Sequence, residues 1–146
     1  MMEAMARTTS GTALDWPSFH QMRVVLQEHN AQWQVRLPDL TKPQYAVLRA
    51  IGAQPGIEQS SAGSAAATDK ATLTALLLRL ETRGLITREV DPADRRRRLL
   101  HLTAAGVRTL KAAVPVVDGI TAHLLERLTA AERDDLHRLL TKLAGD

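Results

Sequence analysis

The stretch TDKATLTALLLRLETRGLITREVDPADRRRRLLHLT, residues 68–103, decides the fold. Its first part spaces apolar residues at i, i+3, i+4 and i+7, which indicates a helix with one apolar face made of Leu73, Leu76, Leu77 and Leu80. Thr68 or Asp69 can cap this helix, and Gly84 can end it with a positive φ. Residues 85–90 then indicate a strand, 91–94 a turn and 97–102 a returning strand. The pattern predicts a helix followed by a two-stranded ribbon.

The opposite face of this helix carries short side chains, among them Ala71 and Ala75. A solvated helix face more often carries Glu and Lys, whereas a face of short side chains can sit deep in a groove. The tip of the ribbon holds four consecutive arginines, residues 95–98, too many like charges to be placed together for stability alone. A helix beside a basic ribbon predicts a winged helix-turn-helix that binds double-stranded DNA.

The same stretch carries a composite motif, formed by Leu80, Glu81, Gly84, Leu85, Ile86 and Arg88, then Asp91, Asp94 and Arg96, then Leu102, Thr103 and Gly106. This motif resembles the wing region of the MarR (multiple antibiotic resistance regulator) family. The resemblance runs from about Thr41 to Gly106 in detail and to the C-terminus in outline. It implies a mainly α fold with a small β wing, a winged helix-turn-helix with N- and C-terminal dimerisation helices.

Charge and composition agree with a DNA-binding surface. The formal net charge is +3, from 19 basic and 16 acidic residues, and residues 68–101 alone hold eight basic and five acidic ones. The basic and acidic residues in the rest of the chain are therefore equal in number. This is expected if the whole excess of positive charge lies on a phosphate-binding surface. The absence of cysteine excludes disulfides, thiolate metal sites and cysteine redox switches. Without a signal-peptide core or a run of ~20 apolar residues, we expect a cytoplasmic protein with no cofactor and no membrane partner.

Four segments follow from the remaining patterns. Residues 1–13 are small and polar and predict a flexible tail. Residues 14–37 predict an N-terminal dimerisation helix, capped by Asp15 with Pro17 in its first turn. Residues 38–104 form the winged helix-turn-helix, and residues 105–146 form C-terminal dimerisation helices. The terminal helices are too apolar for a monomer, which predicts a two-fold homodimer with two DNA-binding heads spaced for a palindromic operator.

The supporting helix of the helix-turn-helix, expected over residues 58–67, departs from the family pattern. Relatives usually place Leu at two core positions where this chain has Ala62 and Ala66, and Gly63 replaces a usual Ala. A glycine inside a helix costs about 1 kcal/mol relative to alanine, and each Leu-sized deletion costs about 2–5 kcal/mol when the site cannot collapse. Either neighbouring side chains fill the space, or this helix is loosely held.

The candidate DNA-binding residues are Lys70, Thr72, Thr74 and Arg79 on the helix and Asp94, Arg95, Arg96 and Arg98 on the ribbon tip. Short Thr side chains suit thymine methyl groups and phosphates, while Arg79 positions rather than specifies. The resemblance implies that Arg96 enters the minor groove with Asp94 holding its guanidinium, and that Arg95 and Arg98 contact phosphates. Arg97 faces either way. The alternative is a solvated basic turn without a DNA role.

An effector site is a separate expectation. His29 lies in an apolar stripe and Arg23 at its edge, and such residues, like Tyr45, are usually structural. The resemblance implies an effector pocket in this region, because related proteins sense aromatic carboxylates from catabolic pathways with Arg, His and Tyr. We expect Arg23 to pair with the carboxylate and His29 and Tyr45 to contact ring substituents. His20 and Trp16 are further candidates.

The expected function is a ligand-responsive repressor released from its operator by a small aromatic carboxylate or phenol. A constitutive DNA-binding regulator without an effector is the alternative. A metal sensor is disfavoured because His20 and His29 lie on different helix faces. An enzyme is disfavoured because the chain has no nucleophile triad, Gly-rich phosphate loop or paired carboxylates near a histidine.

Overall fold

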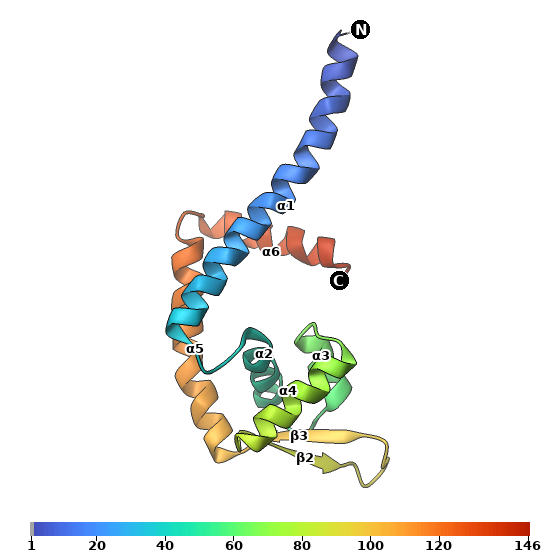
Figure 1. Ribbon diagram of the computed structural model, residues 1–146, viewed down its shortest axis with the longest axis vertical. Coiled ribbons are helices and arrows are strands. Elements are labelled where there is room, and N and C mark those ends of the chain that lie inside the picture. The colour runs from blue at the N-terminus through green and yellow to red at the C-terminus, as the bar shows by residue number, and fades with distance from the viewer. Residues whose placement is uncertain (1) are drawn as a thin grey trace. The chain divides into compact units, whose positions relative to one another are not determined.

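The computed structural model describes the backbone of residues 2–146 and the side chains of residues 16–146 (Figure 1). The described residues form helices α1 (Met2–Arg36), α2 (Lys42–Ala53), α3 (Gln59–Ala65), α4 (Lys70–Thr82), α5 (Ala104–Leu125) and α6 (Ala130–Ala144), and strands β1 (Ile57–Glu58), β2 (Ile86–Val90) and β3 (Arg98–Leu102). The prediction of a mainly α fold with a small β wing is confirmed. None of the described helices is long and apolar enough to span a membrane.

The chain divides into two compact units, one of residues Met1–Val35 and Asp118–Asp146 and the other of residues Arg36–Val117. The second unit contains α2, α3, α4, the sheet and the first half of α5, so it holds all the predicted DNA-binding residues. It ends at Val117, so the first half of α5 lies in the same compact unit as the sheet, beyond the boundary predicted at residue 104.

Helix α2 begins at the predicted cap. The Thr41 hydroxyl accepts a hydrogen bond from the Gln44 N–H at 3.2 Å, and the Gln44 side chain accepts one from the Thr41 N–H at 3.1 Å. This capping box satisfies two N–H groups that the first turn leaves free. The helix buries Tyr45, Leu48 and Ile51, as the sequence predicted.

Helix α4 also begins and ends as predicted. The Asp69 carboxylate accepts a hydrogen bond from the Thr72 N–H at 2.8 Å, and Gly84 follows the helix with a φ of 72°. The four leucines of its apolar face, Leu73, Leu76, Leu77 and Leu80, are all buried. The exposed face therefore carries the short and basic side chains together with Leu78, which is 55% exposed.

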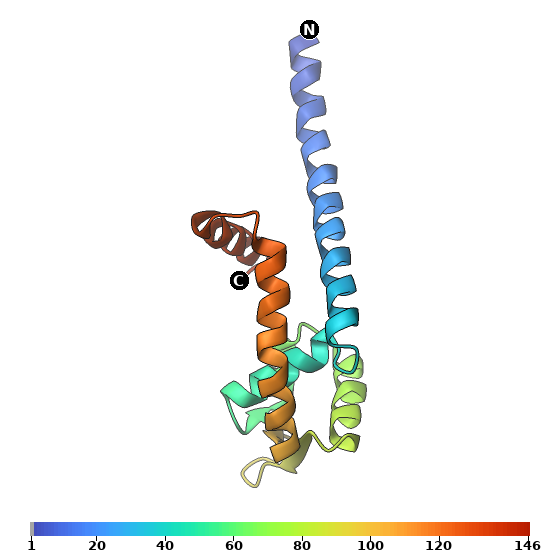
Figure 2. The same ribbon diagram turned by 90° about the vertical axis from the view of Figure 1, so that its left-hand side faces the viewer.

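The sheet has the order β1-β3-β2 with antiparallel pairing. Its β2–β3 hairpin pairs Ile86 with Leu102 and Val90 with Arg98, within one residue of the predicted strands. In Figure 1 the hairpin lies below α2 and α3, and in Figure 2 it again lies below α2. The sequence did not predict β1: Glu58 was expected in a helix but pairs with Leu99, because main-chain pairing to β3 leaves it extended just before α3.

Helix α4 packs against α3 at Gly63. Ala62 is fully buried, and Leu73 lies against Gly63. A Cβ atom placed on Gly63 would lie 2.6 Å from Leu73 Cδ2, and the three atoms nearest to it all belong to Leu73. At Gly63 the first of the two alternatives therefore holds: the Leu73 side chain lies where a Cβ atom would be, and glycine leaves room for it.

We expect Gly63 and Leu73 to be energetically coupled. In a double-mutant cycle of Gly63→Ala and Leu73→Ala, the alanine at 63 should be tolerated better when Leu73 has been shortened, with a coupling of at least about 0.5 kcal/mol. Urea unfolding at fixed protein concentration measures it. A cycle of Gly63→Ala with Leu80→Ala, a buried leucine two turns along α4, is the control and should be additive. Equal additivity in both cycles would contradict this packing.

In the other unit, α1 runs from Met2 to Arg36, so the helix begins before Asp15, where the sequence predicted its cap. The flexible tail over residues 1–13 stays a prediction. Residues 2–7, MEAMAR, are mostly strong helix formers, and Pro17 lies inside the helix rather than in its first turn. Helix α6 begins with the predicted capping box, in which Thr129 and Glu132 exchange hydrogen bonds of 3.2 and 2.9 Å.

Candidate nucleic-acid interface

A tight turn joins α3 to α4 and sets up the helix-turn-helix. The Thr68 N–H donates to the Gly63 carbonyl at 3.2 Å and the Ala67 N–H donates to the Ser64 carbonyl at 3.1 Å. This is the bonding of a helix that ends with a left-handed residue, and Ala67 occupies that position with a φ of 50°. The turn thus brings the Asp69 cap directly to the start of α4.

The cap carboxylate is held by two donors from one residue. Beside the Thr72 N–H, the Thr72 hydroxyl donates to Asp69 Oδ2 at 2.8 Å. These hydrogen bonds, the backbone one first, lower the pKa of Asp69 below its usual range. The Thr72 hydroxyl proton is consequently engaged within the protein, which leaves its methyl group and a lone pair for DNA.

The exposed face of α4 presents the predicted helix residues. Lys70, Thr72, Thr74 and Arg79 are all exposed, and the Thr74 hydroxyl donates to the Lys70 carbonyl at 2.9 Å. Both threonines therefore offer methyl groups rather than donors. Since methyl groups recognise thymine C5-methyl groups in the major groove, the two threonines suit apolar contact with bases, and Lys70 and Arg79 are the polar side chains of this face.

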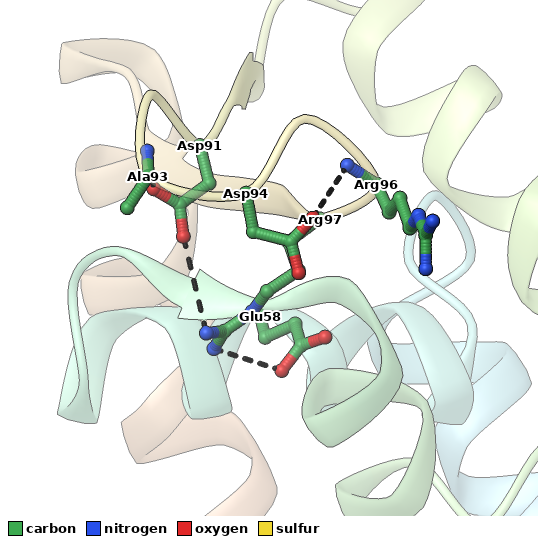
Figure 3. Close-up of polar contacts among 6 residues, drawn as sticks. All are labelled: Glu58, Asp91, Ala93, Asp94, Arg96 and Arg97. Atoms are coloured by element: carbon green, nitrogen blue, oxygen red, sulfur yellow. Dashed lines mark hydrogen bonds and ion pairs between the residues drawn. The ribbon is translucent and has the colours of Figure 1, made fainter.

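The turn between β2 and β3, residues 91–97, is shaped by two aspartates. Asp91 Oδ1 accepts a hydrogen bond from the Ala93 N–H at 2.9 Å, and Asp94 Oδ1 accepts one from the Arg96 N–H at 3.0 Å (Figure 3). The expectation that Asp94 holds the Arg96 guanidinium is not what the structure shows, because its carboxylate is occupied by the backbone. Figure 3 shows the Arg96 side chain extending away from Asp94.

The four arginines of the turn have different surroundings. Arg97 pairs with Glu58 at 3.0 Å and lies 3.9 Å from Asp91 (Figure 3). Arg98 donates to the Arg95 carbonyl at 3.0 Å. Within the described residues, the guanidinium groups of Arg95 and Arg96 have no partner, and both side chains are exposed. Arg95 and Arg96 are thus the arginines of the turn that are most available to contact DNA, while Arg97 links the wing turn to β1 through its ion pair with Glu58.

A concave surface lies between α3, the start of α4 and the wing turn, with a volume of about 400 Å³. It is lined by Glu58, Gln59, Ser60, Gly63, Ser64, Thr68, Lys70, Leu73, Arg96, Arg97 and Arg98. The predicted residues Lys70, Arg96 and Arg98 therefore come together around one depression. Glu58, Gln59, Ser60 and Ser64 were missed; the short polar residues of α3 were the available signal, but only the tertiary fold places them beside the wing.

The motif residues at the base of the wing hold it to the helices. Arg88 pairs with Glu81 at 3.3 Å, which links β2 to α4. The Thr103 hydroxyl donates to the Gly84 carbonyl at 2.6 Å and accepts from the Gly106 N–H at 3.0 Å. The Thr103 N–H donates to the Leu85 carbonyl at 3.0 Å. The motif is therefore a joint between α4, the hairpin and α5.

Comparison with known proteins agrees with this geometry. The MarR family model matches residues 40–97. The transcriptional regulator HosA of Escherichia coli O111:H- is 50% identical over 131 residues, which cover 90% of this chain and 97% of HosA. The chain belongs to the MarR family.

Two further relatives add detail to the MarR assignment. The HTH-type transcriptional repressor NicR of Pseudomonas putida is 32% identical over 126 residues, which cover 85% of this chain and 80% of NicR. The structure of Bordetella bronchiseptica BpsR, whose DNA binding is regulated by 6-hydroxynicotinic acid, superposes with a TM-score of 0.79 at 35% identity, covering 88% of this chain and 98% of BpsR. This MarR-family protein is a DNA-binding transcriptional repressor.

The predicted effector residues of this MarR-family repressor lie on α1 and α2. Arg23, His20 and Trp16 are exposed on α1. His29 is half-buried and packs against Trp33, with ring centroids 5.8 Å apart, and Tyr45 is buried in α2. His29 is thus part of an aromatic pair, which the sequence analysis did not predict.

We expect the ion pair between Arg97 of the wing turn and Glu58 of β1 to contribute measurably to stability. A double-mutant cycle of Glu58→Ala and Arg97→Ala should show a coupling of about 0.2–1 kcal/mol in unfolding free energy, the range of partly exposed ion pairs. The control cycle pairs Glu58→Ala with Arg95→Ala, whose guanidinium does not contact Glu58, and should show none. Equal coupling in the two cycles would mean that the effect comes from net charge and not from the Glu58–Arg97 ion pair.

Proposed function

We propose that this MarR-family repressor acts as a homodimer that binds a palindromic operator and leaves it when a small aromatic acid binds. The observation that supports operator binding is the surface formed by α4 and the wing turn. The exposed threonines and Arg79 of α4 suit the major groove, while Arg95 and Arg96 are free for the adjacent minor groove and phosphates. Arg98 completes the phosphate contacts.

The dimer is supported by apolar side chains that the chain itself leaves uncovered. On α1, Trp16 is 70% exposed and Phe19 64% exposed, and on α6 Leu143 is 69% exposed. No residue of α6 is buried, although Leu136, Leu139 and Leu140 lie on one face. Many large apolar side chains left exposed on two helices favour a protein–protein interface. Analytical ultracentrifugation should give a dimer at micromolar concentration. A well-folded monomer would rule out binding of a palindromic operator by two DNA-binding heads of one dimer.

The effector proposal rests on residue chemistry and on relatives. BpsR responds to 6-hydroxynicotinic acid, which is an aromatic ring with a carboxylate. In this chain Arg23 would pair with the carboxylate through two parallel hydrogen bonds, and His29 and Tyr45 would contact the ring substituents, with His20 and Trp16 beside them. Catabolism of aromatic acids is the corresponding process to be regulated.

Release from DNA requires that the acid bind more tightly to a conformation that does not fit the operator. A ligand shifts such an equilibrium only by its differential affinity for the two states. The operator must therefore weaken binding of the acid by the same factor by which the acid weakens binding of the operator. This reciprocity separates an effector from a compound that merely associates with the protein.

Titration calorimetry tests the effector site with benzoate, hydroxybenzoates and 6-hydroxynicotinate. Wild type should bind at least one of these acids, Arg23→Ala should bind it at least tenfold more weakly, and Arg36→Ala, an exposed arginine later on α1, should bind like wild type. Equal binding by Arg23→Ala would remove the carboxylate clamp. If none of the acids binds, the constitutive regulator becomes the better description, and the DNA-binding function is unaffected.

A further inference from the structure

A second depression lies in the same unit as the DNA-binding residues but on different elements. It has a volume of about 490 Å³ and is formed by α2, the turn that follows it, β3 and the first turns of α5. Its size falls in the range of small-molecule sites, about 300–1,000 Å³. None of the predicted DNA-binding or effector residues lines it.

The inner surface of this depression is apolar. It includes Ile51, Leu102, Val107 and Leu110, of which Ile51 is fully buried and Val107 is 38% exposed. Gly52 sets the depth, since a Cβ atom there would lie 2.8 Å from Leu110 Cδ2 and 3.5 Å from Leu102 Cδ1. The missing side chain lets Leu110 and Leu102 lie on the backbone of α2, and so leaves room above them.

The polar lining is entirely basic. Arg49, His101 and Lys111 contribute to the depression, and no carboxylate does. Arg49 and Lys111 are exposed, and His101 is half-buried. The surrounding sequence adds no counter-charge, because residues 42–57 and 95–117 contain neither Asp nor Glu. Low-dielectric walls lined by one sign of charge concentrate ions of the opposite sign.

We infer that this depression binds a small amphipathic anion, with one or two apolar rings on the leucine floor and an acidic group at Arg49 and Lys111. An uncharged apolar compound would leave the cations without a partner, and a simple inorganic anion would leave the apolar floor exposed to water. Only a compound with both parts satisfies both surfaces. This site is separate from the effector residues Arg23, His29 and Tyr45 and does not depend on them.

The probe is 2-naphthoate, with 2-naphthamide as its uncharged counterpart, followed in ¹H–¹⁵N correlation spectra of the full chain. Naphthoate should shift the amide signals of Gly52, His101 and Val107, and naphthamide should bind at least tenfold more weakly. Lys111→Glu and Arg49→Glu should each weaken naphthoate binding at least tenfold. Both replace exposed side chains, so they should leave the fold intact.

The matched control is Arg108→Glu, which makes the same change of charge at an exposed position of α5 that does not line the depression. It should leave naphthoate binding within about threefold of wild type, as should Arg23→Ala at the proposed effector site. The inference is overturned if naphthoate does not shift the amide signals of Gly52, His101 and Val107, or if naphthamide binds as well as naphthoate. It is also overturned if Arg108→Glu weakens naphthoate binding as much as Lys111→Glu does.

Discussion

Replacing Gly106 by alanine should lower the free energy of unfolding by about 3 kcal/mol, the upper end of what one added methyl group costs in a packed site. A Cβ atom at this position would overlap the carbonyl oxygen of Leu85. That carbonyl is itself fixed, because it accepts the Thr103 N–H. Neither group can rotate away, so the joint between the hairpin and α5 has to move.

Urea unfolding at one protein concentration measures this loss, since the stability of a dimer depends on concentration. Gly52→Ala is the matched control. It makes the same substitution inside a helix, but the new methyl group would meet the end of the Leu110 side chain, which can turn aside. Its loss should be clearly smaller. If Gly106→Ala and Gly52→Ala have equal effects, backbone contact is not the reason for the glycine.

The second large effect concerns operator binding. Arg96→Ala should weaken the complex by about 1–3 kcal/mol per contact, as loss of a groove contact does. The Arg96 backbone is fixed by Asp94, while its guanidinium has no partner within the described residues. The operator would first be selected from random-sequence DNA, and fluorescence anisotropy would then give the affinities.

Arg127→Ala is the control for net charge, because Arg127 is exposed and lies outside the unit that carries α4 and the wing. It should bind the operator within about 0.5 kcal/mol of wild type. If Arg96→Ala binds as tightly as wild type, the wing tip does not contact the operator, and the recognition would have to come from α4 alone.

Signals local in sequence predicted most of the fold. The capping residues Thr41, Asp69 and Thr129 and the left-handed Gly84 mark helix ends, and each acts on residues within one turn of itself. The leucine spacing of α4 gave its buried face, and the turn residues between β2 and β3 gave the hairpin to within one residue. Such features need no knowledge of the rest of the chain.

The features that the sequence did not predict depend on contacts between distant residues. Strand β1 has only two residues and exists because it pairs with β3. The partner of Arg97 is Glu58, 39 residues earlier. The small residues of α3 looked like missing packing until Leu73 of α4 was seen to fill the space at Gly63. Asp94 was assigned to a guanidinium by family resemblance, although its nearest donor is the backbone two residues on.

The central claim is that α4 and the wing turn bind operator DNA together, and the salt dependence of binding tests it most directly. Each phosphate contact contributes roughly −0.9 to the slope of log K against log salt concentration. Arg79→Ala on α4 and Arg95→Ala on the wing turn should each flatten this slope by about 1 per DNA-binding head, while Arg127→Ala should leave it unchanged. A slope that stays at the wild-type value in either the Arg79 or the Arg95 variant would contradict the claim for that element.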